Sequence, residues 1–162
     1  MQIRKILIPL DGSVLAEAAI AKATEVAGLD TTLILLRAVE AHALPGVDPT
    51  GAQVEIVREA EEYLAAMATR LREQGVERVE TSVWYGPAAS TIVEAARLRK
   101  ADLIAMSTHG RSGLGRLILG SVAESVLRGT ATPILLMRVP GAPVEAPKGA
   151  GLARPSKEPA HV

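Results

Sequence analysis

The residues best suited to binding chemistry lie together in the second half of the chain. Residues 103–106 form a short apolar run, typical of a strand that is buried on both faces. Ser107, Thr108 and four glycines follow, and from Ser121 onward the apolar residues recur at helical spacing. A strand, a glycine-rich turn and a helix N-terminus can bind phosphate, because glycines let backbone N–H groups approach an anion and the helix start offers unpaired donors.

Neither of the common phosphate-binding motifs is present in this stretch. The P-loop requires a lysine after its last glycine, but Arg116 follows Gly115 here, and Ile118 stands where a dinucleotide-binding loop has its third glycine. The residues alone therefore fit phosphate binding and a plain glycine-rich connection equally well. In the second case Gly120 only allows a helix to pack closely on the sheet.

Apolar runs and helical stripes alternate along the rest of the chain. Strands are predicted at residues 5–10, 32–39, 76–85, 103–106 and 132–138, and helices at 14–26, 54–74, 87–100 and 117–128. This alternation predicts an open parallel sheet with helices on both faces, which binds ligands at the carboxyl ends of its strands. Residues 42–53 are predicted as a loop beside the site. Residues 140–162 hold five of the ten prolines and no periodicity, and are predicted to form a disordered Pro/Gly-rich tail.

The composition excludes several classes of function. The 162 residues fit one domain, and 48% of them are hydrophobic. Lys plus Arg equals Asp plus Glu, at 18 each, so no net charge attracts the chain to nucleic acid. Two Tyr, one Trp and no Phe offer no platform for stacking bases. We therefore expect no nucleic-acid partner.

The cellular location is predicted from what the sequence lacks. There is no cysteine, which fits a reducing compartment and leaves no thiolate for metal binding or catalysis. The N-terminus shows no signal-peptide pattern, and no apolar run approaches the roughly 20 residues that span a bilayer. We expect a cytoplasmic protein without a membrane partner.

Two segments resemble the signature of the universal stress protein family: residues 3–13 and residues 108–124. The nucleotide-binding branch of that family has the pattern Gly-x2-Gly-x9-Gly-Ser/Thr after its fourth strand. In this chain Gly120 and Ser121 match the end of the pattern and Gly110 its middle glycine, while Ser107 replaces the first glycine. A side chain thus stands where the backbone of the family passes close to its ligand. The resemblance covers residues 2–139, and we predict a universal stress protein domain over residues 1–139.

The resemblance implies a fold and a site. The fold is an adenine nucleotide alpha hydrolase-like α/β domain with strand order 3-2-1-4-5, so that the first and fourth strands border one cleft. The implied ligand is ATP or another adenine nucleotide, with Mg²⁺ or Mn²⁺ at Asp11 bridging its phosphates. The nucleotide-binding residues implied by the match are Pro9, Leu10, Asp11, Ala38, Met106, Ser107, Gly110, Arg111, Gly120, Ser121 and Val122. From the residues alone, Asp11 also fits a role in ordering its own turn, although its position favours the site, and Met106 fits a role in the core equally well.

The family also implies how the protein acts. We expect an ATP-binding regulatory or stress-tolerance protein, with at most slow hydrolysis because no convincing water-positioning base is apparent. The last strand of the family pairs two subunits, which implies a homodimer through Ile134–Met137. One alternative is a dimeric interaction protein of the same fold that does not bind nucleotide, with Ser107 in its favour. A transferase that uses ATP is a weaker third hypothesis.

Overall fold

The computed structural model describes residues 2–40, 49–108 and 120–138. Five parallel strands form one sheet in the order β3-β2-β1-β4-β5, which confirms the predicted order. The strands are β1 (Lys5–Pro9), β2 (Thr32–Val39), β3 (Val79–Tyr85), β4 (Leu103–Ser107) and β5 (Ile134–Met137). The helices are α1 (Val14–Val26), α2 (Pro49–Glu73), α3 (Ala88–Leu98) and α4 (Ser121–Gly129). None of these helices is both long and apolar enough to span a membrane.

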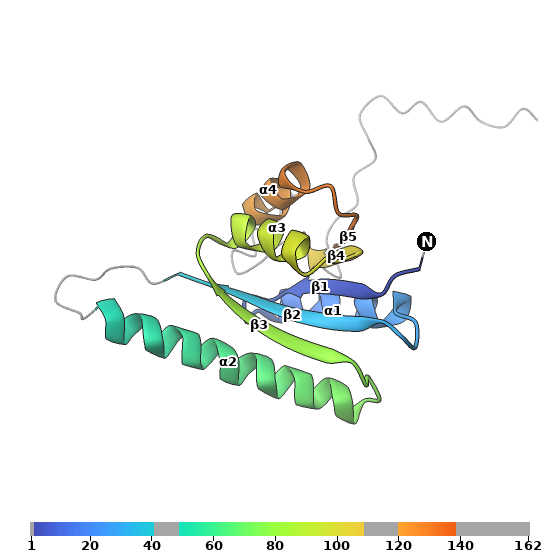
Figure 1. The fold of residues 1–162 in the computed structure, drawn as a ribbon, viewed down its shortest axis with the longest axis horizontal. Coiled ribbons are helices and arrows are strands. Elements are labelled where there is room, and N and C mark those ends of the chain that lie inside the picture. The colour runs from blue at the N-terminus through green and yellow to red at the C-terminus, as the bar shows by residue number, and fades with distance from the viewer. Residues whose placement is uncertain (1, 41–48, 109–119, 139–162) are drawn as a thin grey trace, which may run out of the picture.

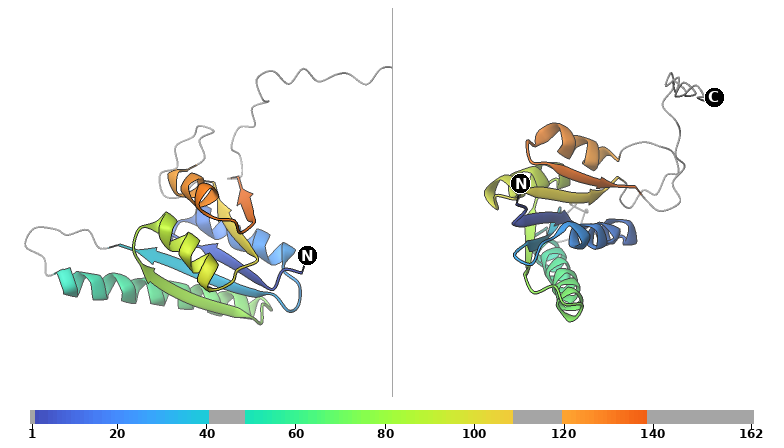
Figure 2. Two further views of the ribbon diagram at one scale, coloured as in Figure 1. Left: turned by 45° about the horizontal axis from the view of Figure 1, so that its top comes forward. Right: turned by 90° about the vertical axis from the view of Figure 1, so that its right-hand side faces the viewer.

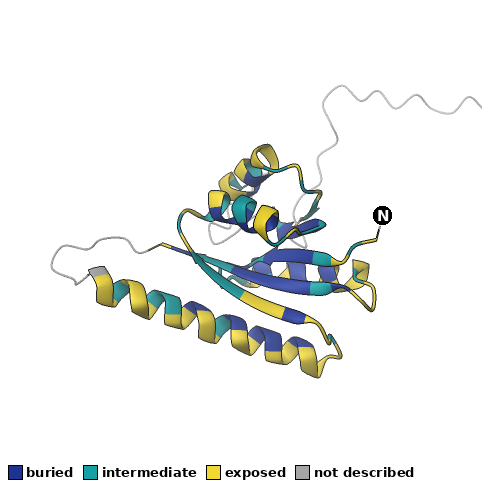
Figure 3. Cartoon of the chain, viewed as in Figure 1, coloured by how far each residue is buried: buried dark blue, intermediate teal, exposed yellow. Residues whose placement is uncertain are grey.

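The helices cover the two faces of the sheet in pairs, α1 and α2 on one face and α3 and α4 on the other (Figures 1 and 2). Successive side chains of a strand point to opposite faces, so β1 contributes Ile6 and Ile8 to the first core and Leu7 to the second. Figure 3 shows burial concentrated on the strands and on the inner sides of the helices. Burial on both faces explains why the central strands are continuous apolar runs.

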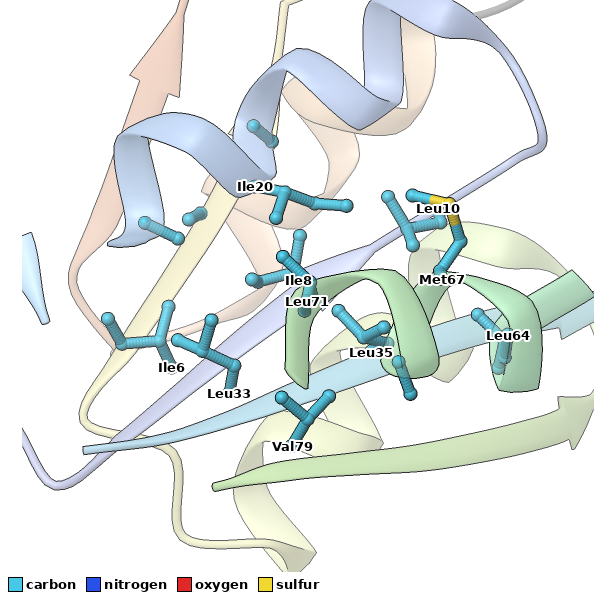
Figure 4. Close-up of a cluster of buried hydrophobic side chains, with 14 of the residues drawn as sticks. Ile6, Ile8, Leu10, Ile20, Leu33, Leu35, Leu64, Met67, Leu71 and Val79 are labelled. Carbon is cyan, nitrogen blue, oxygen red and sulfur yellow. The ribbon is translucent and has the colours of Figure 1, made fainter. Parts of the chain in front are cut away.

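The larger core lies between the sheet and the helices α1 and α2 (Figure 4). Its buried side chains come from four strands and both helices, and include Ile6, Ile8, Ile20, Leu33, Leu35, Leu64, Met67, Leu71, Val79 and Leu103. Leu10, just beyond the end of β1, is 4% exposed and belongs to the same cluster. The chain leaving β1 is therefore anchored in this core before it turns into α1.

Two polar contacts fix the edge of the sheet where the strands begin. The Oδ2 atom of Asp102, before β4, accepts hydrogen bonds from the backbone N–H groups of Arg4 and Lys5, both at 2.9 Å. Thr31, before β2, is 5% exposed, and its hydroxyl donates to the carbonyl oxygen of Ile3 at 2.7 Å. Both contacts tie the start of β1 to its neighbouring strands.

The predicted boundary of α2 was wrong by five residues. The helix begins at Pro49, whereas residues 49–53 were predicted as loop. Proline is tolerated in the first turn of a helix, because the N–H group it lacks would have no partner there. The remainder of that predicted loop, from residue 42 to residue 48, lies outside the described residues.

The start of β3 was also predicted too early. The strand begins at Val79 rather than at residue 76, because the chain after α2 first closes the helix end. Gly75 adopts a φ of +92°, and the N–H group of Val76 donates to the carbonyl oxygen of Leu71 at 3.0 Å. Residue 117, where the fourth helix was predicted to begin, lies outside the described residues, and α4 is described from Ser121. The predicted tail, residues 140–162, also lies outside them.

Candidate functional site

A cavity of about 320 Å³ opens at the carboxyl ends of β1, β2 and β4. The order of the strands reverses between β1 and β4, and the helices that follow these two strands cover opposite faces of the sheet. Ligands of open α/β sheets bind at this kind of reversal. The cavity is lined by Pro9, Leu10, Asp11, Ala16, Ala38, Ala88, Ile92, Met106, Ser107, Thr108, Gly120, Ser121, Val122 and Ala123.

The fold brings most of the predicted site residues to this one cavity. Nine of the eleven line it: Pro9, Leu10, Asp11, Ala38, Met106, Ser107, Gly120, Ser121 and Val122. The other two, Gly110 and Arg111, lie outside the described residues. The structure thus supports the predicted grouping of these residues, while their role as ligand contacts stays a prediction.

Asp11 orders the turn between β1 and α1. Its Oδ1 atom accepts hydrogen bonds from the backbone N–H of Ser13 at 2.9 Å and from the Ser13 hydroxyl at 2.5 Å. The Ser13 oxygen in turn accepts the N–H of Ala16 at 3.1 Å and so caps α1. The structural role weighed for Asp11 is therefore present, and it holds the carboxylate at the cavity wall.

The start of α4 gives the cavity its most polar wall. Gly120 is the N-cap residue of α4, and within the described part of the chain no side chain caps this helix. The N–H of Gly120 itself donates to the carbonyl oxygen of Thr108 at 2.7 Å, which joins the start of α4 to the residue after β4. The N–H groups of the first helical turn are left to face an acceptor from outside the helix, at the positive end of its dipole. Ser121 adds a hydroxyl at the same place.

Other lining side chains of the cavity are apolar. Pro9, Ala38 and Met106 supply apolar surface from the ends of three strands, and Ile92 adds to it from α3. Met106 is 6% exposed and also belongs to the second core, so it serves packing and the cavity wall together. The arrangement suits a ligand with a flat apolar part and an anionic part.

The sequence predictions missed five of the lining residues: Ala16, Ala88, Ile92, Thr108 and Ala123. Four of them lie in the first two turns of a helix that follows a strand, so they reach the cavity only because the fold gathers those helix starts at one edge of the sheet. Alanine and isoleucine carry no chemical signal that singles them out. Thr108 was visible, since it directly follows Ser107 at the end of β4.

The described wall of the cavity offers a metal ion one carboxylate, that of Asp11. Elsewhere in the described ranges, too, no three His, Cys, Asp or Glu side chains gather in a way that would hold a metal ion. Mg²⁺ is commonly held by one or two carboxylates together with substrate phosphates and water. The residues present therefore fit a hard cation that arrives with a phosphorylated ligand.

A family model and curated relatives match this chain, and both are universal stress proteins. The model described as the universal stress protein family matches residues 2–138. Universal stress protein MJ0531 of Methanocaldococcus jannaschii is 32% identical over 141 residues, which cover 85% of this chain and 83% of that protein.

Solved structures share the fold over most of this chain. The hypothetical protein MJ0577 superposes with a TM-score of 0.77 at 26% identity, over 86% of this chain and 98% of that one. A universal stress protein in complex with cAMP gives a TM-score of 0.66 at 21% identity, over 85% of this chain and 98% of that one. A universal stress protein family protein of Arabidopsis thaliana with AMP bound gives 0.61 at 14%, over 83% and 91%. At these last two identities the likeness shows the fold alone.

Proposed function

The chain belongs to the universal stress protein family, and on that premise we propose that it is a cytoplasmic regulatory or stress-tolerance protein that binds an adenine nucleotide, ATP in the first place. The nucleotide would occupy the cavity at the ends of β1, β2 and β4. The observation that carries the proposal is the start of α4, which has no side-chain cap among the described residues and faces the same cavity as an apolar wall.

The two ends of the cavity would divide the ligand between them. Backbone N–H groups of Ser121 and Val122, with the Ser121 hydroxyl, would donate to phosphate oxygens at the helix start. The base would lie against Pro9, Ala38 and Met106. Asp11 would hold a Mg²⁺ or Mn²⁺ ion on the phosphates, whose charge that ion would partly neutralise. The phosphates would thus lie against hydrogen-bond donors and a cation, and the base against apolar side chains.

Two of the solved neighbours support the choice of an adenine nucleotide, since one was solved with cAMP and the other with AMP. These ligands belong to distant relatives that share the fold. What supports the same class of ligand in this chain is that its cavity combines an apolar slot with a helix start suited to phosphate.

Hydrolysis of the bound nucleotide would be slow at most. Efficient phosphoryl transfer requires a group that orients water and a cation that stabilises the transition state. Asp11 is the carboxylate among the described lining residues, and its Oδ1 atom is already bonded to Ser13. A binding protein that responds to nucleotide fits this wall better than a rapid ATPase.

The test is nucleotide binding by the full chain and by two matched variants. Ala38→Leu places three further carbons in the cavity, whereas Ala18→Leu places the same group on the exposed side of α1. We expect an adenine nucleotide either to copurify with the wild type or to bind it in calorimetry with Mg²⁺. Ala38→Leu should weaken binding at least about tenfold, roughly the cost of one steric misfit of 1.4 kcal/mol, and Ala18→Leu should not.

The same experiment can reject the proposal. A wild type that carries no nucleotide and shows no heat with AMP, ADP or ATP would favour the alternative of an interaction protein that does not bind nucleotide. Equal affinities in the wild type and Ala38→Leu would show that a nucleotide binds elsewhere.

We also propose that two copies pair through β5, which ends the sheet. Ile104 donates to the carbonyl oxygen of Pro133 and Thr108 to that of Met137, so the odd-numbered residues of β5 face β4. The backbone groups of Ile134 and Leu136 then face the outer edge, where nothing in the described ranges pairs with them. Light scattering should give twice the chain mass of 17.0 kDa. A mass of one chain at all concentrations would refute the pairing.

A further inference from the structure

Arg37 places a cation against the segment that joins β1 to α1. It lies near the end of β2, and its Nη1 atom donates to the carbonyl oxygen of Leu10 at 3.4 Å. The N–H of Leu10 donates to the carbonyl oxygen of Leu36 at 2.8 Å, one residue before Arg37. Both backbone groups of Leu10 are therefore held from β2. Leu10 and the next residue, Asp11, line the cavity, whereas Arg37 is not among the described lining residues.

Gly12 makes room for this cation. A Cβ atom built on Gly12 would lie 3.1 Å from Nη1 of Arg37, and 3.6 and 3.7 Å from Nη2 and Cζ. The φ angle of Gly12 is +81°, a conformation that residues with a side chain rarely adopt. The guanidinium thus lies close to the backbone of the turn, and its proximity and the positive φ both favour glycine at residue 12.

A second set of contacts holds Arg37 from the side of α2. Its guanidinium carbon lies 5.6 Å from the ring centroid of Tyr63, within the range of a cation–π contact. The Tyr63 hydroxyl donates to Oε1 of Glu17 on α1 at 3.0 Å, and Arg70 donates to the other carboxylate oxygen at 3.2 Å. Burial and this bond to Glu17 raise the pKa of Tyr63, so the phenol stays a neutral donor. The ring is held in place beneath the cation.

These contacts run from α2 through Arg37 to the wall of the cavity. We infer that Arg37 is a positioning residue: it holds residues 10–12 in the conformation that nucleotide binding requires, and Tyr63 holds Arg37. The inference rests on the proposed function. A binding site whose wall is correctly placed only part of the time has its apparent affinity reduced by that fraction. Loss of Arg37 weakens binding in this way without removing any contact to the ligand.

The test compares variants that keep or remove each contact. Arg37→Met keeps an apolar stem but removes the cation and its donors, Tyr63→Phe keeps the ring, and Tyr63→Leu removes it. Arg70→Met, at the exposed end of the network, serves as the control. Calorimetry gives the Kd for AMP and for ATP with Mg²⁺. Amide hydrogen exchange of the ligand-free protein follows the Ser13 N–H, which donates to Asp11.

We expect Arg37→Met to raise the Kd about tenfold, which corresponds to a wall correctly placed about a tenth of the time, and to speed exchange at Ser13. Tyr63→Leu should shift both readouts in the same direction by a smaller factor. Tyr63→Phe and Arg70→Met should leave the Kd within about twofold, because each keeps the ring beneath the cation. A purely structural role would lower the melting temperature and leave the Kd of the folded protein unchanged.

The two possible failures can be told apart. A wild type that binds AMP or ATP, with Arg37→Met equal to it in Kd and in Ser13 exchange, overturns the inference and leaves the proposed function intact. A wild type that binds no nucleotide overturns the proposed function. In that case unchanged Ser13 exchange in Arg37→Met overturns the positioning as well, and faster exchange supports the hold of Arg37 on the segment.

Discussion

Replacing Gly12 by alanine would test how closely Arg37 lies against the turn after β1. At a φ of +81° an alanine costs about 1–2 kcal/mol relative to glycine. The new methyl group would also lie 3.1 Å from Nη1 of Arg37, which is tighter than an ordinary contact. The guanidinium is the end of a flexible side chain, so it can move away. Its bond to Leu10 is already 3.4 Å long, and that bond would be lost.

The loss of that hydrogen bond adds about 0.5–1.5 kcal/mol to the strain of the backbone. We therefore expect Gly12→Ala to lower the free energy of unfolding by about 2–3 kcal/mol in total. Gly75 provides the matched control, because its φ is +92° and nothing lies within 4 Å of a Cβ built there. Gly75→Ala should cost only the backbone strain of about 1–2 kcal/mol.

Urea unfolding of both variants measures the difference, which should be about 1 kcal/mol, or about 2–4 °C in melting temperature for a chain of this length. In the double variant Gly12→Ala/Arg37→Met the extra loss should vanish, since the group that crowds the methyl is gone. Equal losses for Gly12→Ala and Gly75→Ala, or full additivity with Arg37→Met, would refute the close contact. We also expect Gly12→Ala to bind nucleotide more weakly than the wild type, as we expect for Arg37→Met.

Three further predictions concern stability. Thr31→Val should cost about 1–3 kcal/mol in urea unfolding, because it leaves the carbonyl oxygen of Ile3 without its buried donor. Asp102→Ala should cost about 1–2 kcal/mol in the same assay, since it removes the acceptor of two N–H groups, that of Lys5 among them. The pKa of Tyr63 is raised above the ordinary tyrosine value of 10.0, so the unfolded chain loses this proton first and stability falls as the pH rises above that value. Tyr63→Phe should remove that part of the alkaline loss in unfolding curves measured across this pH range.

The sequence predicted the elements of the fold well where burial dictates the residue pattern. The run that became β2 was predicted with its observed bounds, since its central residues pack on both faces. The first five residues of α2 were missed because no side chain from Thr50 to Gln53 is fully buried, so no apolar stripe marks them. Pro49 and Gly51 also favoured the prediction of a loop, because proline and glycine are common in loops. The order of the strands came from the family resemblance, because periodicity does not encode which strands are neighbours.

The candidate site was predictable in its polar part and only partly in its apolar part. Gly120 and Ser121 follow a motif, and the structure brings them to the cavity where Asp11 also lies. Ala88 lies far from these residues in the sequence, and it reaches the cavity because α3 follows β3 at the same edge of the sheet. Propensity and spacing describe a residue in its own element, and the lining of a cavity is decided between elements.

The cavity stays open because several of its lining side chains are small. Ala16, Ala38 and Ala88 come from three elements and each ends at a methyl group, so the space between the sheet and the helix starts stays open. Its polar wall is mostly backbone, at the start of α4. A site built from backbone donors and small side chains offers few groups whose chemistry can be recognised in a sequence. What remains visible is the position of Gly120 and Ser121 in the chain after the buried strand β4.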